Sequence, residues 1–323
     1  MKVNHIQNIN SLFPHVSRFR PGRERNGCAG QTSPVRPRNI FPHLKRHIKS
    51  CILILIILLL AAFILTGLSR QSLKLTVYDI TSPAVTDALD GYKIVHISDF
   101  HSGLFSGTAD DVIKMTAAQT PDIICLTGDI VDGRTRDFVP VEALVSGLSG
   151  IAPVYAVSGN NEHYETSINV EMNNIYNRYG VRIMDGRTIT VYKDGGALTL
   201  SGITDSKGEN RTRLLLEVMS LKHDPGRDGF GIILYHRAND FDMVADAGYD
   251  LVLSGHIHGG IITLPGIGGI LSPDSELFPK YAGGLYEVNG TFLVSSRGIG
   301  NNHFIPRIYT PPEVVLVVLR SGE

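Results

Sequence analysis

Cysteine is scarce in this sequence. The three cysteines are Cys28, Cys51 and Cys125, and only Cys125 lies beyond residue 68. That part of the chain can therefore form no internal disulfide, and the sequence has no Cys-x-x-Cys or Cys/His spacing typical of zinc sites. These absences exclude a disulfide scaffold and a thiolate metal site. With 323 residues, the chain is long enough to bury a core without such cross-links.

Basic residues are scarce in most of the chain as well. Beyond residue 50 the sequence has 20 Lys and Arg against 30 Asp and Glu, whereas residues 1–50 have ten Lys and Arg and one acid, Glu24. Because binding to a phosphate backbone needs clustered Lys and Arg, the acidic part is not expected to bind nucleic acid. The basic segment 1–50 is expected to be a disordered arm. It is either a solvated tail or a cytoplasmic topology signal that contacts anionic lipid.

One long stretch lacks charge altogether. Residues Cys51–Leu68, CILILIILLLAAFILTGL, form an 18-residue apolar run that would span about 27 Å as a helix. This length is near the lower limit for crossing the hydrocarbon core of a bilayer. About 50 residues precede the run, far more than the short charged region of a cleaved signal peptide, so we expect an uncleaved membrane anchor.

The charges that flank this run predict its orientation. Within about 20 residues on either side, five basic residues precede it and two follow it: Arg36, Arg38, Lys45, Arg46 and Lys49, then Arg70 and Lys74. The positive-inside rule then places the N-terminus in the cytoplasm and the rest of the chain outside it, at the cell membrane. No adjacent Arg pair precedes the run, so a Sec-type route is expected. The expected domains are the arm 1–50, the single-pass anchor 51–68 and a folded domain 73–323.

Beyond the run, strand-like and helix-like segments alternate. Strands are expected at Lys93–Ser98, Asp122–Gly128, Pro153–Gly159, Val181–Met184, Gly231–His236, Asp250–Gly255 and Glu313–Leu319, with hairpins around residues 194–196 and 289–290. Helices are expected at Thr108–Gln119, Phe138–Leu148, Ser167–Tyr179 and Asp240–Ala247. The pattern predicts an α/β fold in which helices cover mixed sheets within one domain.

Polar side chains gather where these strands end, which is where α/β folds place their sites. The candidate metal ligands are Asp99, His101, Asp129, Asn160, His236, His256 and His258. In extended chain, residues i and i+2 point the same way. Asp99 and His101 are therefore expected to converge on one point. The same expectation holds for His256 and His258.

The chemistry of this donor set indicates divalent metals. Carboxylate, imidazole and amide donors without a thiolate suit Mn, Fe or Zn. Seven donors exceed what one ion normally takes, whereas two ions that share Asp129 account for all of them. No GxSxG or CxxxxxR sequence is present, so no motif indicates a covalent nucleophile instead.

The order of these residues resembles that of the calcineurin-like metallophosphoesterase superfamily. The superfamily pattern is DxH, GDxxD, GNH(D/E), H and GHxH, and here it runs from about Lys93 to Leu319. The stretches SGHIHGG, VSSRGIG and PPEVVLVVL are similar to the membrane-associated phosphodiesterase branch that includes UDP-2,3-diacylglucosamine pyrophosphatase-like proteins. The resemblance implies a four-layer αββα sandwich with a centre of two divalent metal ions.

By motif position, the resemblance also implies the ligands of each ion. The first ion would be held by Asp99, His101, Asp129 and His258, and the second by Asp129, Asn160, His236 and His256. The implied reaction is hydrolysis by a metal-activated water, with in-line attack on phosphorus and no covalent enzyme intermediate.

One position departs from the superfamily pattern. Where the pattern has Gly-Asn-His, this chain has Gly-Asn-Asn, so Asn161 stands at the place of a histidine that aids the leaving group. Either His163 supplies that imidazole from a differently bent loop, or the enzyme lacks this acid and favours substrates with good leaving groups. A third alternative is a protein that binds metal or a ligand without useful catalysis.

Other residues near the motifs have plainer interpretations. His96 is expected to be a core histidine, Asp132 a cap, and Glu162 part of the loop scaffold. Arg297 is either a phosphate contact in the substrate site or a partner in a surface ion pair. The Gly- and Pro-rich segment Leu264–Tyr281 follows GHIHGG, and it is either a substrate-facing loop that touches acyl chains or an ordinary surface loop.

Together these features predict a membrane-anchored dimetal phosphohydrolase that acts outside the cytoplasm on a phosphodiester, pyrophosphate or phosphomonoester. Anchoring beside a bilayer suits a lipid-linked substrate. A phosphoprotein phosphatase is the nearest enzymatic alternative, although the sequence has no large insertion that resembles a phosphopeptide groove. A catalytically weak, metal-binding interaction module is the alternative from another class, and substrate turnover separates it from both enzymes.

Overall fold

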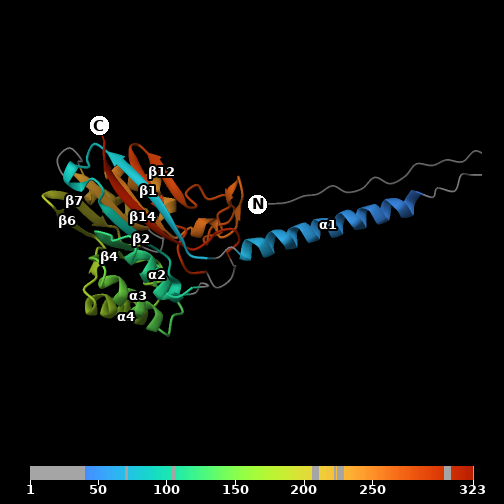
Figure 1. Ribbon diagram of the computed structural model, residues 1–323, viewed down its shortest axis with the longest axis horizontal. Coiled ribbons are helices and arrows are strands. Elements are labelled where there is room, and N and C mark those ends of the chain that lie inside the picture. The colour runs from blue at the N-terminus through green and yellow to red at the C-terminus, as the bar shows by residue number, and fades with distance from the viewer. Residues whose placement is uncertain are drawn as a thin grey trace, which may run out of the picture. The chain divides into compact units, whose positions relative to one another are not determined.

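The computed structural model describes residues 41–69, 72–103, 107–205, 211–221, 223, 229–301 and 307–322. Most of the expected disordered arm therefore lies outside the described residues. The described chain consists of one long helix, α1 (Phe41–Ser69), and a folded body that begins at Ser72 (Figure 1). Contacts divide the chain inside α1, between Ile54 and Leu55. The expected domain boundaries at residues 50, 68 and 73 stay predictions.

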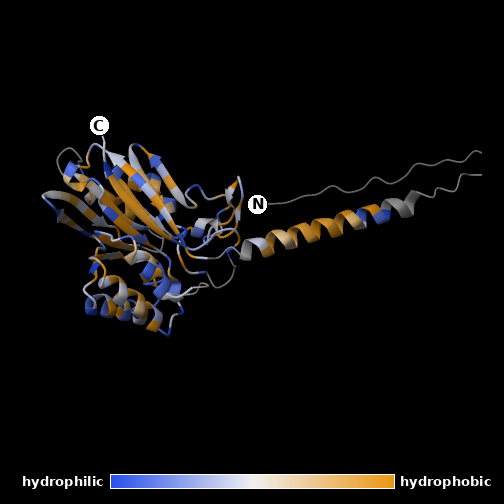
Figure 2. Cartoon of the chain, in the orientation of Figure 1, coloured by the Kyte–Doolittle hydropathy of each residue, from blue (hydrophilic) through white to orange (hydrophobic). Residues whose placement is uncertain are grey.

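Helix α1 is longer than the apolar run from which it was expected. It begins at Phe41, ten residues before Cys51, so the last part of the expected arm is helical. Lys and Arg are good helix formers, and Pro42 falls in the first turn, where proline is tolerated. The window Arg46–Thr66 is long and apolar enough to cross a membrane, and none of it is buried against other described residues. Figure 2 shows the hydrophobic stretch along most of α1.

The body contains two six-stranded mixed sheets. The first has the strand order β1 (Lys74–Ser82), β14 (Glu313–Ser321), β2 (Lys93–Ile97), β3 (Ile123–Thr127), β4 (Val154–Val157) and β5 (Arg182–Ile183). The second has the order β12 (Gly284–Val288), β13 (Thr291–Ser295), β9 (Leu251–Gly255), β8 (Phe230–Arg237), β7 (Gly196–Gly202) and β6 (Arg187–Lys193). A small hairpin joins β10 (Thr263–Leu264) and β11 (Gly268–Gly269).

Three hydrophobic cores separate four layers of structure. Helices α2 (Ala109–Ala117), α3 (Val139–Ser149) and α4 (Thr166–Arg178) cover one face of the first sheet (Figure 1), and α5 (Arg211–Ser220) and α7 (Phe241–Val244) pack on the second sheet. Strand β2 shows how one strand serves two cores. Val95 and Ile97 join the core under the helices, whereas Ile94 joins the core between the sheets. The four-layer αββα sandwich implied by the resemblance is confirmed.

Local sequence explains where these elements begin and why they are buried. Helix α2 starts with a capping box, in which Asp111 N–H donates to Thr108 Oγ1 at 3.3 Å and Thr108 N–H donates to Asp111 Oδ2 at 2.8 Å. Helix α3 has Pro140 in its first turn. Strand β3 is apolar at nearly every position because both of its faces are buried.

Most of the expected elements are present with small shifts at their ends, and the expected helix Asp240–Ala247 is the short α7 flanked by 3-10 turns. Within the described residues, β1, α5, the β10–β11 hairpin and the other short 3-10 helices were not expected. Strand β1 is the edge of the first sheet, and its alternating polar and apolar residues, KLTVYDITS, carry a strand pattern that sequence reasoning passed over. Its pairing is long-range, since Lys74 lies opposite Glu313 in a parallel ladder. Helix α5 buries only a narrow stripe, Leu214 and Val218.

Candidate metal centre

Six of the seven candidate ligands form two clusters. The first donor group is Asp99, His101 and His258, and the second donor group is Asp129, His236 and His256. Within each group, one ligand atom per residue lies within 4.8 Å of the others, and all six residues are buried. These residues lie at or just after the ends of β2, β3, β8 and β9. Strand ends from both sheets therefore meet at one place.

The backbone at most of these ligands is left-handed rather than extended. The φ angle is positive at five of them: 52° at Asp99, 47° at His101, 52° at Asp129, 74° at His256 and 54° at His258. Few non-glycine residues adopt this conformation, and such strain concentrates at functional sites. Asp99 and His101 still converge on one group, but His256 and His258 belong to different groups. The expectation that His256 and His258 share one point is wrong, because the chain between them turns instead of continuing a strand.

Two glycines let neighbouring loops approach the ligands closely. A Cβ atom at Gly255 would collide with the side chain of Asp99, and one at Gly159 would collide with Asp129. The backbone N–H of His256 donates to Asp99 Oδ2 at 3.0 Å, so a residue of the second donor group holds a ligand of the first. The two groups therefore form one connected centre.

In the first donor group, two rings face each other. The Nε2 atoms of His101 and His258 are 3.1 Å apart, and Asp99 Oδ1 lies 3.5 Å from His258 Nε2. Arg307 donates to His258 Nδ1 at 2.8 Å, so the proton of the neutral His258 ring lies on Nε2 and points to His101. Burial lowers the pKa of both histidines, and the Arg307 charge adds to this effect at His258. An ion that binds His258 Nε2 has to displace that proton.

In the second donor group, the ring nitrogens that face away from the group have acceptors. His236 Nδ1 lies 2.7 Å from the carbonyl oxygen of Thr127, and His256 Nε2 lies 2.8 Å from Asp274 Oδ2. These acceptors hold a proton on the outer nitrogen of each ring. His236 Nε2 and His256 Nδ1, 3.2 Å apart, are therefore turned inward. Asp129 Oδ2 lies 3.4 Å from His236 Nε2 and completes the group.

The carboxylate of Asp129 makes this group attractive to positive charge. Burial lowers the pKa of His236, but attraction by Asp129 outweighs burial and raises it to about 10. Burial likewise opposes ionisation of Asp129, yet His236 and His101 hold its pKa below the usual range. A carboxylate that stabilises an extra proton on the facing ring also stabilises a divalent cation in that position. Both donor groups thus fit the oxygen and nitrogen ligation of Mn, Fe or Zn.

The seventh candidate ligand, Asn160, is tied to the second donor group through Arg237. Asn160 Oδ1 accepts from Arg237 Nη2 at 3.3 Å, and Arg237 Nη1 lies 3.0 Å from His256 Nε2. Arg237 Nε donates to Asp205 Oδ2 at 3.0 Å and to Asp205 Oδ1 at 3.1 Å, and Arg237 Nη1 donates to Asp274 Oδ2 at 3.1 Å. Two carboxylates therefore fix a buried guanidinium beside the centre. Direct ligation by Asn160 stays a prediction.

Asn161 contacts both donor groups. Its Nδ2 donates to Asp129 Oδ2 at 2.8 Å and lies 3.4 Å from His101 Nδ1. An amide nitrogen donates a hydrogen bond here but has no proton to release to a leaving group. His163, the alternative acid, has its Nδ1 3.5 Å from Asn169 Nδ2 on α4. A catalytic role for His163 stays a prediction.

Glu162 joins the loops that carry the ligands. Its carboxylate accepts from the backbone N–H groups of Asp129 at 3.0 Å, Ile130 at 2.8 Å and Gly159 at 2.8 Å. The side chain is buried, and burial together with the nearby Asp129 charge raises its pKa to about 7. Glu162 is therefore part of the loop scaffold, in agreement with its sequence interpretation.

The remaining residues that the sequence analysis named make hydrogen bonds or ion pairs within the fold. Arg297 binds Glu313 through Nη1 at 2.7 Å and through its backbone N–H at 2.8 Å, and a phosphate contact stays a prediction. His96 is fully buried, with Nε2 2.7 Å from Thr127 Oγ1, as expected of a core histidine. Asp132 Oδ1 accepts a backbone N–H two residues further on at 2.9 Å and closes a turn.

Sequence reasoning missed three charged residues that contact the imidazoles. These are Arg237, Asp274 and Arg307. Arg237 directly follows His236, which was the only available signal. Asp274 and Arg307 lie 18 and 49 residues from the histidines that they contact, so nothing in their sequence neighbourhood marks them.

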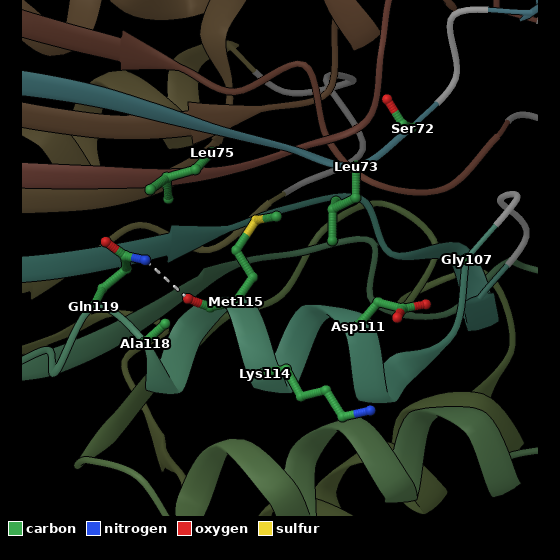
Figure 3. Close-up of a pocket in the computed structure, with 9 residues that line it drawn as sticks. All are labelled: Ser72, Leu73, Leu75, Gly107, Asp111, Lys114, Met115, Ala118 and Gln119. Carbon is green, nitrogen blue, oxygen red and sulfur yellow. Dashed lines mark hydrogen bonds between the residues drawn. The ribbon is translucent and has the colours of Figure 1, made fainter.

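A cleft of about 650 Å³ lies elsewhere on the body. It is lined by residues of β1 and α2, among them Leu75, Met115 and Gln119 (Figure 3). None of the donor residues lines it. The volume of this cleft does not make it the candidate active site. The candidate active site is identified by the chemistry of the donor groups.

Comparison with known proteins gives a family match over the same residues. The family model described as calcineurin-like phosphoesterase matches residues 92–260, a range that contains both donor groups. The Bacillus subtilis (strain 168) protein named "Uncharacterized metallophosphoesterase YkuE" is 28% identical over 273 residues, which cover 79% of this chain and 88% of that protein.

Two further relatives carry more informative names. "Phosphodiesterase YaeI" of Escherichia coli (strain K12) is 24% identical, with 71% of this chain and 82% of that protein covered. "Transmembrane protein with metallophosphoesterase domain" of Danio rerio is 22% identical, with 83% and 63% covered. Because the family model matches more than half of the chain and includes both donor groups, this protein belongs to the calcineurin-like phosphoesterase family, which hydrolyses phosphoester bonds and normally uses divalent metal ions.

Proposed function

We propose that this protein is a membrane-anchored phosphohydrolase that uses two divalent ions, Mn, Fe or Zn, to cleave a phosphodiester, pyrophosphate or phosphomonoester. The observation that carries the proposal is the pair of buried donor groups at the strand ends. A single structural metal site would need only one such group.

The proposed ligands follow the two donor groups. Asp99, His101 and His258 would hold the first ion, and His236, His256 and Asn160 the second, with Asp129 shared between the ions. When bound, such a pair of ions polarises the phosphoryl oxygens and lowers the pKa of a bound water. Glu162 supports this arrangement by fixing the backbone at Asp129.

The chain supplies further positive charge near the substrate. Arg237 and Arg307 are both buried beside imidazoles of the donor groups. The charge of Arg237 is balanced by Asp205 and Asp274, so the charge of Arg307 contributes most to favouring an anionic phosphoester over a neutral ester. Both are held by protein acceptors, so they act on the substrate through charge and through the histidines that they position.

Asn161 limits the leaving groups that the centre handles well. Its amide hydrogen-bonds Asp129 and offers no acid to a departing alkoxide. Phosphate or aryl oxide leaving groups need no such help. We therefore rank pyrophosphates and activated diesters above simple alkyl monoesters, and we rank a phosphoprotein phosphatase lower still, since serine alkoxide is a poor leaving group.

Membrane anchoring is proposed through α1, with the arm 1–50 in the cytoplasm and the domain 73–323 outside it. The composition of Arg46–Thr66 and the excess of basic residues before the run support this orientation. The name of the Danio rerio relative, a transmembrane protein, supports anchoring in a membrane.

For the substrate, we propose a phosphodiester or pyrophosphate that is linked to a lipid. The name of the Escherichia coli relative, a phosphodiesterase, supports the diester. The stretches SGHIHGG, VSSRGIG and PPEVVLVVL support the branch that includes UDP-2,3-diacylglucosamine pyrophosphatase-like proteins.

The test measures hydrolysis by the full chain in detergent micelles. Bis-p-nitrophenyl phosphate and p-nitrophenyl phosphate are compared after chelation and after addition of Mn²⁺. We expect release of p-nitrophenol only with metal, and faster release from the diester. Two bound ions per chain without turnover of either substrate would instead favour the metal-binding interaction module, for which the missing histidine at Asn161 gives the reason.

A further inference from the structure

A loop beside the donor groups exposes bulky apolar side chains. The segment Thr263–Lys280, here called the apolar loop, follows the GHIHGG motif and precedes β12. Within it, Ile267, Leu277 and Phe278 are 66%, 66% and 62% exposed. Clustered exposure of large apolar side chains is typical of a contact surface.

The loop backbone is ordered in a way that keeps these side chains outward. Ile270 N–H donates to Ile262 O at 2.8 Å, Phe278 N–H donates to Ile270 O at 2.8 Å, and Leu271 forms a bridge with Leu277. Phe278 has a φ of 54°, which is strained for a bulky residue. Strain that holds an aromatic side chain in water indicates a function rather than a packing role.

The apolar loop and the attachment of α1 share one region of the body. Thr263 N–H donates to Ile308 O at 2.9 Å, and, four residues further along, Pro312 O accepts from Lys74 N–H at 2.9 Å. Lys74 is the first residue of β1 and lies five residues after the end of α1 at Ser69. Five residues of chain span at most about 18 Å. The end of α1 is therefore tethered to Lys74, on the part of the body where the segment 308–312 also pairs with the base of the loop.

The same loop reaches the metal centre. Asp274 lies 2.8 Å from His256 Nε2, and Thr263 Oγ1 donates at 2.9 Å to the carbonyl of Gly259, which follows His258. A hollow of about 230 Å³ is lined by Gly259 and by the exposed Ile267 and Phe278. Any surface that covers these side chains is brought next to the donor groups.

The charged residues of the apolar loop indicate which type of membrane surface can bind it. The loop carries Asp274 and Glu276, and its one cation, Lys280, is paired with Asp242 at 3.0 Å. Attraction to anionic lipid headgroups is therefore not the driving force. We infer that the apolar loop docks into the interface of a zwitterionic phospholipid bilayer and holds the donor groups at the height of the lipid phosphates. This inference rests on the proposed membrane anchor and adds a second contact with the bilayer.

The absence of tryptophan from the sequence makes a direct test available. Phe278→Trp places a single fluorophore on the apolar loop, and Ile267→Trp is a second reporter if the first variant folds poorly. The matched control is Tyr192→Trp, because Tyr192 is 78% exposed on β6, the edge of the second sheet farthest from β12. Each full-length variant is reconstituted in phosphatidylcholine vesicles, with or without bromine on the acyl chains.

We expect brominated lipid to lower the emission of Phe278→Trp at least about twofold, because interfacial apolar groups enter the acyl boundary, and to leave Tyr192→Trp unchanged. Equal emission from both variants overturns the inference. A blue-shifted Phe278→Trp signal that bromine does not quench also overturns it, and assigns the surface to a second copy of the chain or to α1.

Two controls separate this inference from the proposed function. Flotation of the variants with vesicles tests the anchor, and variants that do not float remove both the anchor and the docking surface. Metal-dependent hydrolysis of bis-p-nitrophenyl phosphate tests the enzyme independently of the bilayer. Retained hydrolysis and flotation without quenching would leave the proposed function intact and reject only the docking surface.

Discussion

The two donor groups contain the same residue types, one aspartate and two histidines, but their surroundings differ. In the second donor group, a carbonyl oxygen and the carboxylate of Asp274 lie at the outer ring nitrogens, and the cation that also approaches His256 Nε2, Arg237, is paired with Asp205 and Asp274. In the first donor group, a cation, Arg307, donates to the outer nitrogen of His258. Acceptors on the outer nitrogen raise the basicity of the inner one, whereas a cation lowers it.

This difference indicates that the residue types of a donor group alone do not determine its affinity for a metal ion. In the second donor group, Asp129 raises the pKa of the facing His236 to about 10, and the same attraction favours a divalent ion that displaces the proton of His236, so we expect this group to bind its ion more tightly. The first donor group has to give up the proton on His258 Nε2, and burial with the Arg307 charge lowers the pKa of His258. Of the four predictions below, three concern the donor groups and one concerns His96, a buried histidine outside them.

The largest effect is expected for Asp129, which is proposed to serve both groups. We expect Asp129→Asn to lower metal-dependent hydrolysis by about 1,000-fold, because charge stabilisation at both ions is lost. Asp132→Asn is the matched control, since Asp132 lies in the same loop and closes a turn. Turnover of bis-p-nitrophenyl phosphate is measured for both. Similar losses in the two variants would show that the effect belongs to the loop rather than to the ligand.

The Asn161 side chain contacts Asp129 of one group and His101 of the other, and its replacement sharpens the comparison. We expect Asn161→His to raise hydrolysis of substrates with poor leaving groups by about 100-fold, because it restores a general acid. Activated aryl esters should gain little. The measurement is the ratio of alkyl to aryl phosphodiester turnover. No gain in this ratio, together with a collapse of activity in His163→Ala, would assign the acid to His163 instead.

Sequence reasoning selected the residues of the two donor groups because two signals coincided. Continuous apolar runs mark buried strands such as β3, and polar residues such as Asp129 stand at the strand ends. The fold followed from the same order of motifs. The i, i+2 pattern could not divide His256 and His258 between the groups, since the division depends on left-handed backbone in the turn between them, and only the superfamily resemblance implied it.

The difference between the groups was also beyond the sequence. Arg307 and Asp274 reach their histidines only through tertiary folding, and neither stands in a motif. Arginine and aspartate are also common in surface loops, so the residue type alone does not mark either position as part of the site. The sequence therefore located the donors but not the residues that distinguish one group from the other.

His96 shows what burial does to a histidine without a carboxylate partner. Burial lowers its pKa from 6.5 to about 3, whereas Asp129 raises that of His236. Since the folded pKa lies below the unfolded one, His96 contributes stability above pH 6.5 that is lost as pH falls toward 3. Between pH 7 and pH 5, this loss amounts to about 2 kcal/mol.

The measurement for His96 is chemical unfolding of the metal-free full chain at both pH values. His96→Gln removes the titrating ring and keeps a polar side chain for Thr127. We expect the variant to lose about 2 kcal/mol less than the unmodified chain on acidification. An identical pH dependence in the two proteins would mean that His96 is protonated without cost in the folded state.

The smallest effect is expected at Asp274, where it tests the comparison most directly. Asp274→Asn removes the charged acceptor from His256 Nε2, so the ion of the second donor group should bind about tenfold more weakly, a change of about 1.4 kcal/mol. Asp274→Glu should restore part of this affinity, and Glu276→Gln is the matched control in the same loop. Calorimetric titration of the chelator-treated full chain resolves the two ions. If both ions weaken equally, Asp274 acts on the whole centre through the loop, and the two donor groups are not distinguished by their outer acceptors.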